Sequence, residues 1–160
     1  MIAAPRMTPA ESEAWMKVVA LIELLPSALD SQLQRDAQLT HFEFAALSML
    51  QFQADHTTRM SALAVATNAT LPRLSHVVSR LETRGLVERF PCPEDRRATN
   101  VRLTDLGRRT VIRATPEHIA TARELVVDAL SPQQLTQLDE IATVLLRRLD
   151  PEGKLHQLAG

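Results

Sequence analysis

The chain has 160 residues, of which 45% are hydrophobic, so it is long enough for one compact unit or for one subunit of an intertwined dimer. It contains four glycines and no G-x-G-x-x-G or P-loop pattern, which excludes the common glycine-rich nucleotide sites. The first twenty residues include Glu11, Glu13 and Lys17 without an apolar run. We therefore expect no signal peptide, no membrane span and a cytoplasmic location.

The N-terminal segment is expected to form one long helix. Thr8 and Glu11 make a capping box around Pro9, a residue that favours the first helical position. An apolar stripe continues to about Gln34, and Pro26 inside it predicts a kink rather than two helices. The stripe consists of Trp15, Val18, Val19, Ile22, Leu25, Leu29 and Leu33. Such a stripe needs a partner, and a second copy related by two-fold symmetry is the most economical one.

Two shorter helices are predicted next. Thr40 and Glu43 form a second capping box, and the helix that they open has an apolar side. Its buried positions are predicted to be mostly Phe42, Ala45, Ala46, Leu47, Met49, Leu50 and Phe52. After a loop over residues 53–58, Ser61 can cap a short helix that ends at the turn Thr67-Asn68-Ala69. The inward residues of this short helix are predicted to be Leu63, Ala64 and Val65.

The following helix begins at Thr70, an N-cap residue type, and its apolar positions recur at spacings of three and four. We expect Leu71, Leu74, Val78 and Leu81 to face the core. The opposite side carries Arg73, His76 or Val77, Arg80 and Arg84. Arginine can donate two hydrogen bonds to a guanine edge, and the helix N-terminus with Thr70 and Ser75 can donate to phosphate oxygens. A basic, slender helix of this kind fits a DNA major groove, and Asn68 in the turn before it is a further candidate contact.

A β hairpin is predicted directly after this helix. Gly85 can end the helix in a left-handed conformation, and residues 86–90 and 101–103 alternate as strands. The tip between them holds two acids and two arginines. Asp95 precedes Arg97 by two residues, a spacing that lets the carboxylate hold the guanidinium in one orientation for entry into a narrow minor groove.

Two more helices are expected after the hairpin. Thr104 caps the first, which continues through Pro116 with a kink, and Ser131 with Gln134 caps the last. The apolar face of the last helix consists of Leu135, Leu138, Ile141, Val144, Leu145, Leu146 and Leu149. We expect residues 1–36 and 115–160 to form dimerisation helices and residues 40–114 to form a winged helix-turn-helix domain.

Charge is divided unevenly along the chain. The formal net charge of -1 would argue against binding to DNA, because phosphate contacts require cations. However, residues 59–113 contain eleven arginines and five acidic residues, whereas the rest of the chain is acidic. A basic segment within an acidic frame directs a phosphate backbone to one surface.

Catalysis is the competing class of function. The five histidines show no H-E-x-x-H pairing, no serine lies in a G-x-S-x-G context, and one cysteine cannot build a thiolate zinc site. We therefore expect no catalytic residues, no metal and no cofactor.

Cys92 lies in the hairpin, where we expect it to be exposed near arginines. Its thiol has two alternative interpretations: it is oxidised as part of a redox switch, or it has no functional role.

The residues of the hairpin carry a resemblance to a known family. Asp95-Arg96-Arg97, followed by Leu103-Thr104-Asp105-Leu106-Gly107 and preceded by residues 79–89, resembles the signature of the MarR family of transcriptional regulators. The resemblance implies a two-fold dimer on a pseudo-palindromic operator, with Arg97 in the minor groove, Asp95 as its buttress and Arg96 as a neighbouring contact. It also implies a small, often aromatic or anionic effector bound between the dimer helices and the DNA module, for which Trp15, His41 and His118 are candidates.

The sequence thus predicts a mainly α-helical protein in which a winged helix-turn-helix with a two-stranded β wing is joined to an intertwined dimerisation domain. Its predicted function is transcriptional regulation, most often repression by family resemblance, through double-stranded DNA and without enzymatic activity. Two alternatives stay open: a redox-sensing regulator that works through Cys92, and a winged-helix protein-interaction module that does not bind DNA. The concentration of arginines between residues 59 and 113 favours DNA over a protein scaffold.

Overall fold

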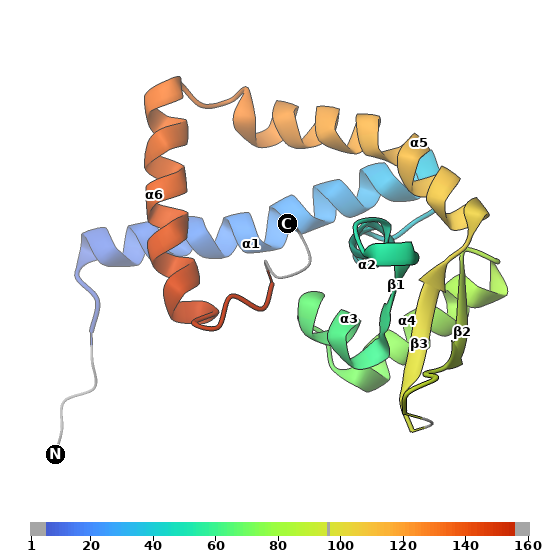
Figure 1. Ribbon diagram of the computed structural model, residues 1–160. Coiled ribbons are helices and arrows are strands. Elements are labelled where there is room, and N and C mark those ends of the chain that lie inside the picture. Colours follow the sequence, from blue (N-terminus) through green and yellow to red (C-terminus); the bar gives the residue numbers. More distant parts are fainter. Residues whose placement is uncertain (1–5, 96, 156–160) are drawn as a thin grey trace, which may run out of the picture.

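The computed structural model describes residues 6–95 and 97–155 (Figure 1). In chain order the elements are α1 (Pro9–Ala37), α2 (His41–Gln51), η1 (Ala54–His56), β1 (Thr57–Arg59), α3 (Met60–Ala66), α4 (Leu71–Thr83), β2 (Val87–Pro91), β3 (Thr99–Leu103), α5 (Asp105–Ala122), η2 (Arg123–Val127) and α6 (Pro132–Leu149). The mainly helical, winged helix-turn-helix architecture that the sequence predicts is confirmed.

The starts of the helices follow the capping residues. Complete capping boxes open α1, α2 and α6, at Thr8, Thr40 and Ser131. Both internal prolines lie within continuous helices, since α1 passes through Pro26 and α5 passes through Pro116. The end of α5 then widens into the π-helical turn η2 before the chain enters α6.

The sheet has three antiparallel strands in the order β1-β3-β2, not the two strands that the sequence suggests. The additional strand, β1, lies in the predicted loop and aligns Thr57 with Arg102 and Arg59 with Asn100 of β3. Three polar residues carry no alternation that periodicity can detect, so only pairing with β3 defines this strand. Helix α3 follows β1 directly, with Arg59 at the N-cap and no side-chain cap from Ser61.

Two glycines connect the hairpin to its neighbouring helices. Gly85 has φ +71°, the left-handed conformation expected after the end of α4. Gly107 lies in the first turn of α5, where a Cβ would come within 2.0 Å of the Leu86 carbonyl oxygen. The Thr104 hydroxyl also donates a hydrogen bond to the Gly85 carbonyl at 2.7 Å. These contacts fix the base of the wing against α5.

The core lies between the C-terminal end of α1, helices α2, α3 and α4, the sheet and the first half of α5. Its fully buried side chains include Leu33, Leu39, Leu47, Leu50, Leu63, Leu74, Val78, Leu81 and Val101. Among the residues of the α2 and α3 region that the sequence predicts to be in the core, Phe52 is 71% exposed and Val65 is 48% exposed. Phe52 follows the last turn of α2, and α3 has only seven residues, so neither side chain reaches the core.

The terminal helices carry apolar surface that the single chain leaves uncovered. Figure 1 shows α5 running alongside α1, with α6 turned away after η2. Within residues 6–95 and 97–155, α6 makes only marginal contact with other elements. Its apolar face is exposed at Leu135, Leu138, Ile141, Val144, Leu145, Leu146 and Leu149, and α1 exposes Trp15, Met16, Leu21, Ile22 and Leu24. No helix of the described chain has the length and apolar character that crossing a bilayer requires.

Candidate nucleic-acid interface

Helix α4 presents three different sides. The core side holds Leu74, Val77, Val78 and Leu81, so Val77 belongs to the core and His76 to the exposed surface. Leu71 was predicted to be buried and is 48% exposed, because it lies in the first turn, beyond the edge of the core. With about 3.6 residues per turn, the ridge that points farthest from the core consists of Pro72, His76, Ser79 and Thr83.

One flank of α4 is basic and lies against the first turn of α2. The Arg73 guanidinium lies 4.7 Å from the centre of the Phe42 ring. Arg80 donates to Glu43 Oε1 at 3.0 Å, and Arg84 lies 3.6 Å from Glu43 Oε2. The three arginines share one side, as their spacing predicts, but all three are held by residues of α2.

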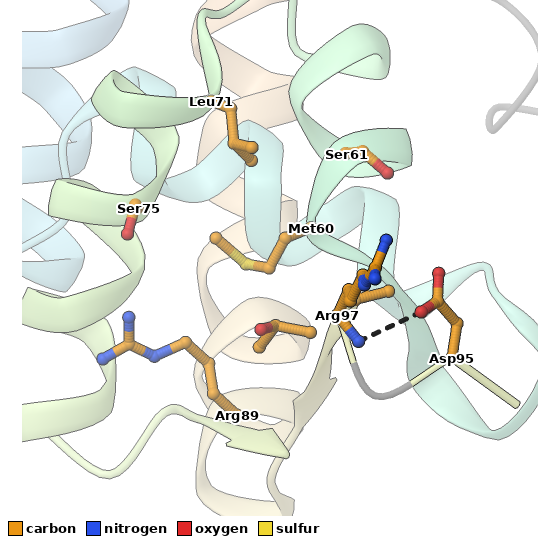
Figure 2. Close-up of a pocket in the computed structure, with 9 residues that line it drawn as sticks. Met60, Ser61, Leu71, Ser75, Arg89, Asp95 and Arg97 are labelled. Atoms are coloured by element: carbon orange, nitrogen blue, oxygen red, sulfur yellow. Dashed lines mark hydrogen bonds between the residues drawn. The ribbon is translucent and has the colours of Figure 1, made fainter. Parts of the chain in front are cut away.

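The other flank of α4 faces the wing across a cleft of about 350 Å³ (Figure 2). Ser75 from α4 and Asp95 with Arg97 from the wing line this cleft, so it gathers three of the predicted DNA contacts. It is also lined by residues that the sequence analysis did not assign to DNA, namely Met60, Ser61, Leu71, Arg89, Ala98 and Thr99. The position of Leu71 could have been inferred from the sequence. It directly follows the N-cap Thr70, so it lies in the first turn of α4, before the helix reaches the core.

The wing tip is ordered by a backbone contact. Asp95 Oδ1 accepts a hydrogen bond from the backbone N–H of Arg97 at 3.0 Å, and the Asp95 carbonyl accepts one from Ala98 N–H at 2.9 Å. This contact is to the backbone of Arg97 and not to its guanidinium, so a hold of Asp95 on the guanidinium in the DNA complex stays a prediction. An aspartate two residues before an N–H forms an Asx turn, which leaves the guanidinium available to solvent. Arg96, another predicted contact, lies outside the described residues.

The turn before α4 has mainly a structural role. Thr70 Oγ1 accepts from the backbone N–H of Arg73 at 3.4 Å, which confirms the predicted N-cap. Asn68 has φ 49°, a left-handed conformation that asparagine tolerates. Both residues line a groove that faces the end of α6, separate from the cleft that holds Ser75 and Arg97.

A charge pair supports the floor of the cleft. The guanidinium of Arg89 donates to Glu82 Oε2 at 2.6 and 2.9 Å, and Arg89 N–H donates to Glu82 Oε1 at 2.8 Å. These hydrogen bonds from Arg89 lower the pKa of the Glu82 carboxyl below its ordinary value of 4.5. The pair fastens β2 to the end of α4.

Cys92 was expected to be exposed and is 3% exposed. The backbone N–H of Cys92 donates to the Ala98 carbonyl, which turns its side chain inward across the base of the wing tip. The pKa of the thiol is lowered, first by the backbone N–H of Glu94, then by that of Asp95 and by the charge of Arg59. Burial therefore limits access to a thiol whose electrostatic surroundings favour the thiolate.

A second cavity lies between α2 and α5, with a volume of about 440 Å³. Its lining is mostly apolar and includes Phe44, Phe52, Ile112, Pro116, His118 and Ile119. The ring of His118 packs against Phe44 in a tilted arrangement, with ring centres 4.5 Å apart and an interplanar angle of 55°. It also lies 5.7 Å from the ring of His41, and its Nδ1 is 3.1 Å from Gln32 Oε1. Burial, and then the charge of His41, lower the pKa of His118. Trp15 is 50% exposed on α1 and does not line this cavity, so the three effector candidates do not form one cluster.

Metal binding has little support among the side chains. In the part of the chain that the structure describes, no three His, Cys, Asp or Glu residues are grouped closely enough to hold a metal ion.

The sequence and the fold are similar to those of known transcriptional regulators. Residues 39–99 match the model of the MarR family. The chain is 32% identical over 107 residues to the transcriptional repressor MprA of Escherichia coli K12, an alignment that spans 67% of this chain and 60% of MprA. A solved structure of Sco3205, a MarR family transcriptional regulator from Streptomyces coelicolor in complex with DNA, superposes with a TM-score of 0.88 at 37% identity over 94% of each chain. AbsC, a MarR family regulator from the same organism, superposes with a TM-score of 0.86 at 33% identity over 93% of this chain and all of AbsC. The chain therefore belongs to the MarR family.

Proposed function

We propose that this protein is a DNA-binding transcriptional regulator without catalytic activity, and that it acts as a repressor, as the name of MprA states for that relative. The observation that carries the proposal is the cleft between α4 and the wing, which is lined by Ser75 from α4 and by Arg97 from the wing. The exposed ridge of α4 enters a major groove, where His76 and Ser79 reach base edges. Arg97 enters the adjacent minor groove. The similarity to Sco3205, whose structure was solved in complex with DNA, supports binding to DNA.

The protein acts as a homodimer on a pseudo-palindromic operator. Residues 1–36 and 115–160 form the dimerisation part, and residues 40–114 form the DNA-binding part. The apolar faces of α1 and α6 support this division, because each is left uncovered by a single chain. Two-fold symmetry would set the two α4 helices about 34–36 Å apart, the spacing of successive major grooves.

A small effector is proposed to bind in the cavity between α2 and α5, and the protein is proposed to be cytoplasmic. The apolar lining suits an aromatic molecule, and His118, which lines the cavity, offers a polar group that can hydrogen bond to an anionic one. Cavity residues lie on α2, which contacts α4, and on α5, which contacts α1. An effector there would act on the separation of the two DNA-binding parts.

Selection of bound fragments from random duplex DNA tests the proposal. We expect enrichment of a pseudo-palindrome with half-sites centred about 10 base pairs apart, and an affinity that falls steeply with salt. Absence of any enriched sequence together with salt-insensitive association would overturn the proposal and favour the protein-interaction alternative. Peroxide treatment of wild type and Cys92→Ser separates the redox alternative, which requires that only the wild type lose DNA binding.

A further inference from the structure

Glu43 makes more contacts than a helix cap requires. Its side chain is 6% exposed, at the N-terminus of α2. One oxygen, Oε2, accepts from the backbone N–H of Thr40 at 2.9 Å and completes the capping box. The other, Oε1, accepts from Arg80 at 3.0 Å, and Arg84 lies 3.6 Å from Oε2. One buried carboxylate therefore meets two arginines from α4.

The capping box alone does not explain the negative charge at this position. In the box that opens α6, Gln134 provides the same contact to Ser131 with a neutral amide. In the box that opens α1, Glu11 is exposed, and Thr8 is its hydrogen-bond partner. A buried carboxylate costs free energy unless hydrogen bonds and nearby cations compensate for its lost hydration. The charge of Glu43 is thus matched to Arg80 and Arg84.

This pairing changes what the basic flank of α4 can offer to DNA. A recognition helix in a major groove lies between two phosphate backbones, and free arginines on its flanks bind phosphates of any sequence. Here Glu43 neutralises part of the charge of Arg80 and Arg84, while Arg73 rests on Phe42. On the adjacent ridge His76 is exposed and Ser79 is half-buried, so base contacts are available there without a matching gain in phosphate contacts.

We propose that Glu43 is a specificity-determining residue that engages Arg80 and Arg84, reduces their contacts with phosphates and thereby limits sequence-independent binding. Arg80 then acts as an anchor of α4, in place of the base contact that its position in the sequence suggests. This role rests on the proposed function, since it concerns how a DNA-binding protein distinguishes its operator from other duplexes. Glu43 is a positioning residue, because it acts through the two arginines.

The variant Glu43→Gln tests this role, since glutamine keeps the capping contact and removes the charge. We expect the slope of log affinity against log salt on non-operator DNA to become steeper by about one to two units, at roughly 0.9 unit per added phosphate contact. Non-specific affinity at low salt should rise about three- to tenfold, and the ratio of operator to non-operator affinity should fall. An unchanged salt slope in a folded Glu43→Gln protein would overturn the proposal.

Two further variants control the result. Glu11→Gln makes the same change in the exposed capping box of α1 and should leave the salt slope unchanged. Arg80→Gln leaves Arg84 beside Glu43 and should also leave the salt slope unchanged. A decrease of the slope by about one unit would show that Arg80 contacts a phosphate. That result would overturn the proposal even if the Glu43→Gln protein fails to fold. Absence of duplex binding by the wild type would instead contradict the proposed function itself.

Discussion

The carboxylate of Asp95 accepts a hydrogen bond from the backbone N–H of Arg97 at 3.0 Å, within the tip of the wing. This contact shapes the backbone at Arg97, and the guanidinium of Arg97 has no hydrogen bond or ion pair with the residues that the structure describes. The two residues of the D-x-R motif therefore have separate roles: one orders the turn, and the other supplies the charge.

Arg97→Ala should weaken operator binding by about 1–3 kcal/mol, because it removes a charge-assisted contact in a groove. Fluorescence anisotropy with a labelled operator duplex measures the change. Arg123→Ala is the matched control, since it also removes one arginine charge but lies in η2, beyond α5. Equal losses in the two variants would mean that general charge, and not the wing, accounts for affinity.

Asp95→Asn should bind the operator nearly as well as the wild type, because an amide oxygen can also accept from the backbone N–H of Arg97. Asp95→Ala removes the acceptor and should lose affinity, though less than Arg97→Ala does. The same anisotropy titration compares the three proteins. If Asp95→Asn binds as poorly as Asp95→Ala, the negative charge matters and an ionic contact with the guanidinium forms on DNA.

Much of the fold could be predicted from local sequence signals. The capping boxes at Thr8, Thr40 and Ser131 place three helix starts correctly, because capping depends on residues three positions apart. Gly85 marks the end of the α4 region for a similarly local reason. Strand β1 could not be predicted, since its three residues become a strand only by pairing with β3, more than forty positions later.

The site was less predictable, because it depends on contacts between elements. Periodicity places Arg73, Arg80 and Arg84 on one side of α4, but it cannot reveal that Glu43 and Phe42 of α2 meet that side. The spacing of Asp95 and Arg97 is compatible with either a side-chain or a backbone contact, and the structure has the second. Residues that act at long sequence separation therefore require the tertiary structure.

Leu71→Ala should reduce the preference for thymine at one position of each half-site. Leu71 is 48% exposed beside Ser75 in the cleft, and an apolar side chain there can contact a thymine methyl group. Replacing that thymine with uracil should weaken wild-type binding about fourfold, which corresponds to the free energy of burying about one methyl group. The same replacement should not affect binding by Leu71→Ala. Leu106→Ala, at a leucine 47% exposed on α5, should respond to uracil like the wild type.

Glu82→Gln should lower the free energy of unfolding by about 1 kcal/mol at pH 7, because Arg89 loses a charged partner that is only partly screened by solvent. The folded pKa of Glu82 is below 4.5, so the stabilisation is present above that pH and is lost as pH falls through the folded pKa. Urea denaturation between pH 7 and pH 3.5 should show the two proteins converging in acid. Glu88→Gln, which breaks the more exposed pair with Arg102, should have a smaller effect. A difference that stays constant down to pH 3.5 would contradict this assignment.

Ile141→Asp should convert the protein to monomers, because it places a charge in the exposed apolar face of α6. Light scattering after gel filtration gives the mass, and operator affinity should fall with it. Thr136→Asp introduces the same charge on the opposite side of the same helix and should remain dimeric. A dimeric Ile141→Asp protein would move the interface away from α6.

Hydroxyl-radical footprinting on a selected operator, combined with the mass of the complex, tests the central claim that two copies bind adjacent grooves through α4 and the wing. The account predicts two chains per duplex and two protected half-sites centred about 10 base pairs apart, with minor-groove protection that disappears in Arg97→Ala. One chain per duplex, or a single protected region that Arg97→Ala leaves intact, would contradict it.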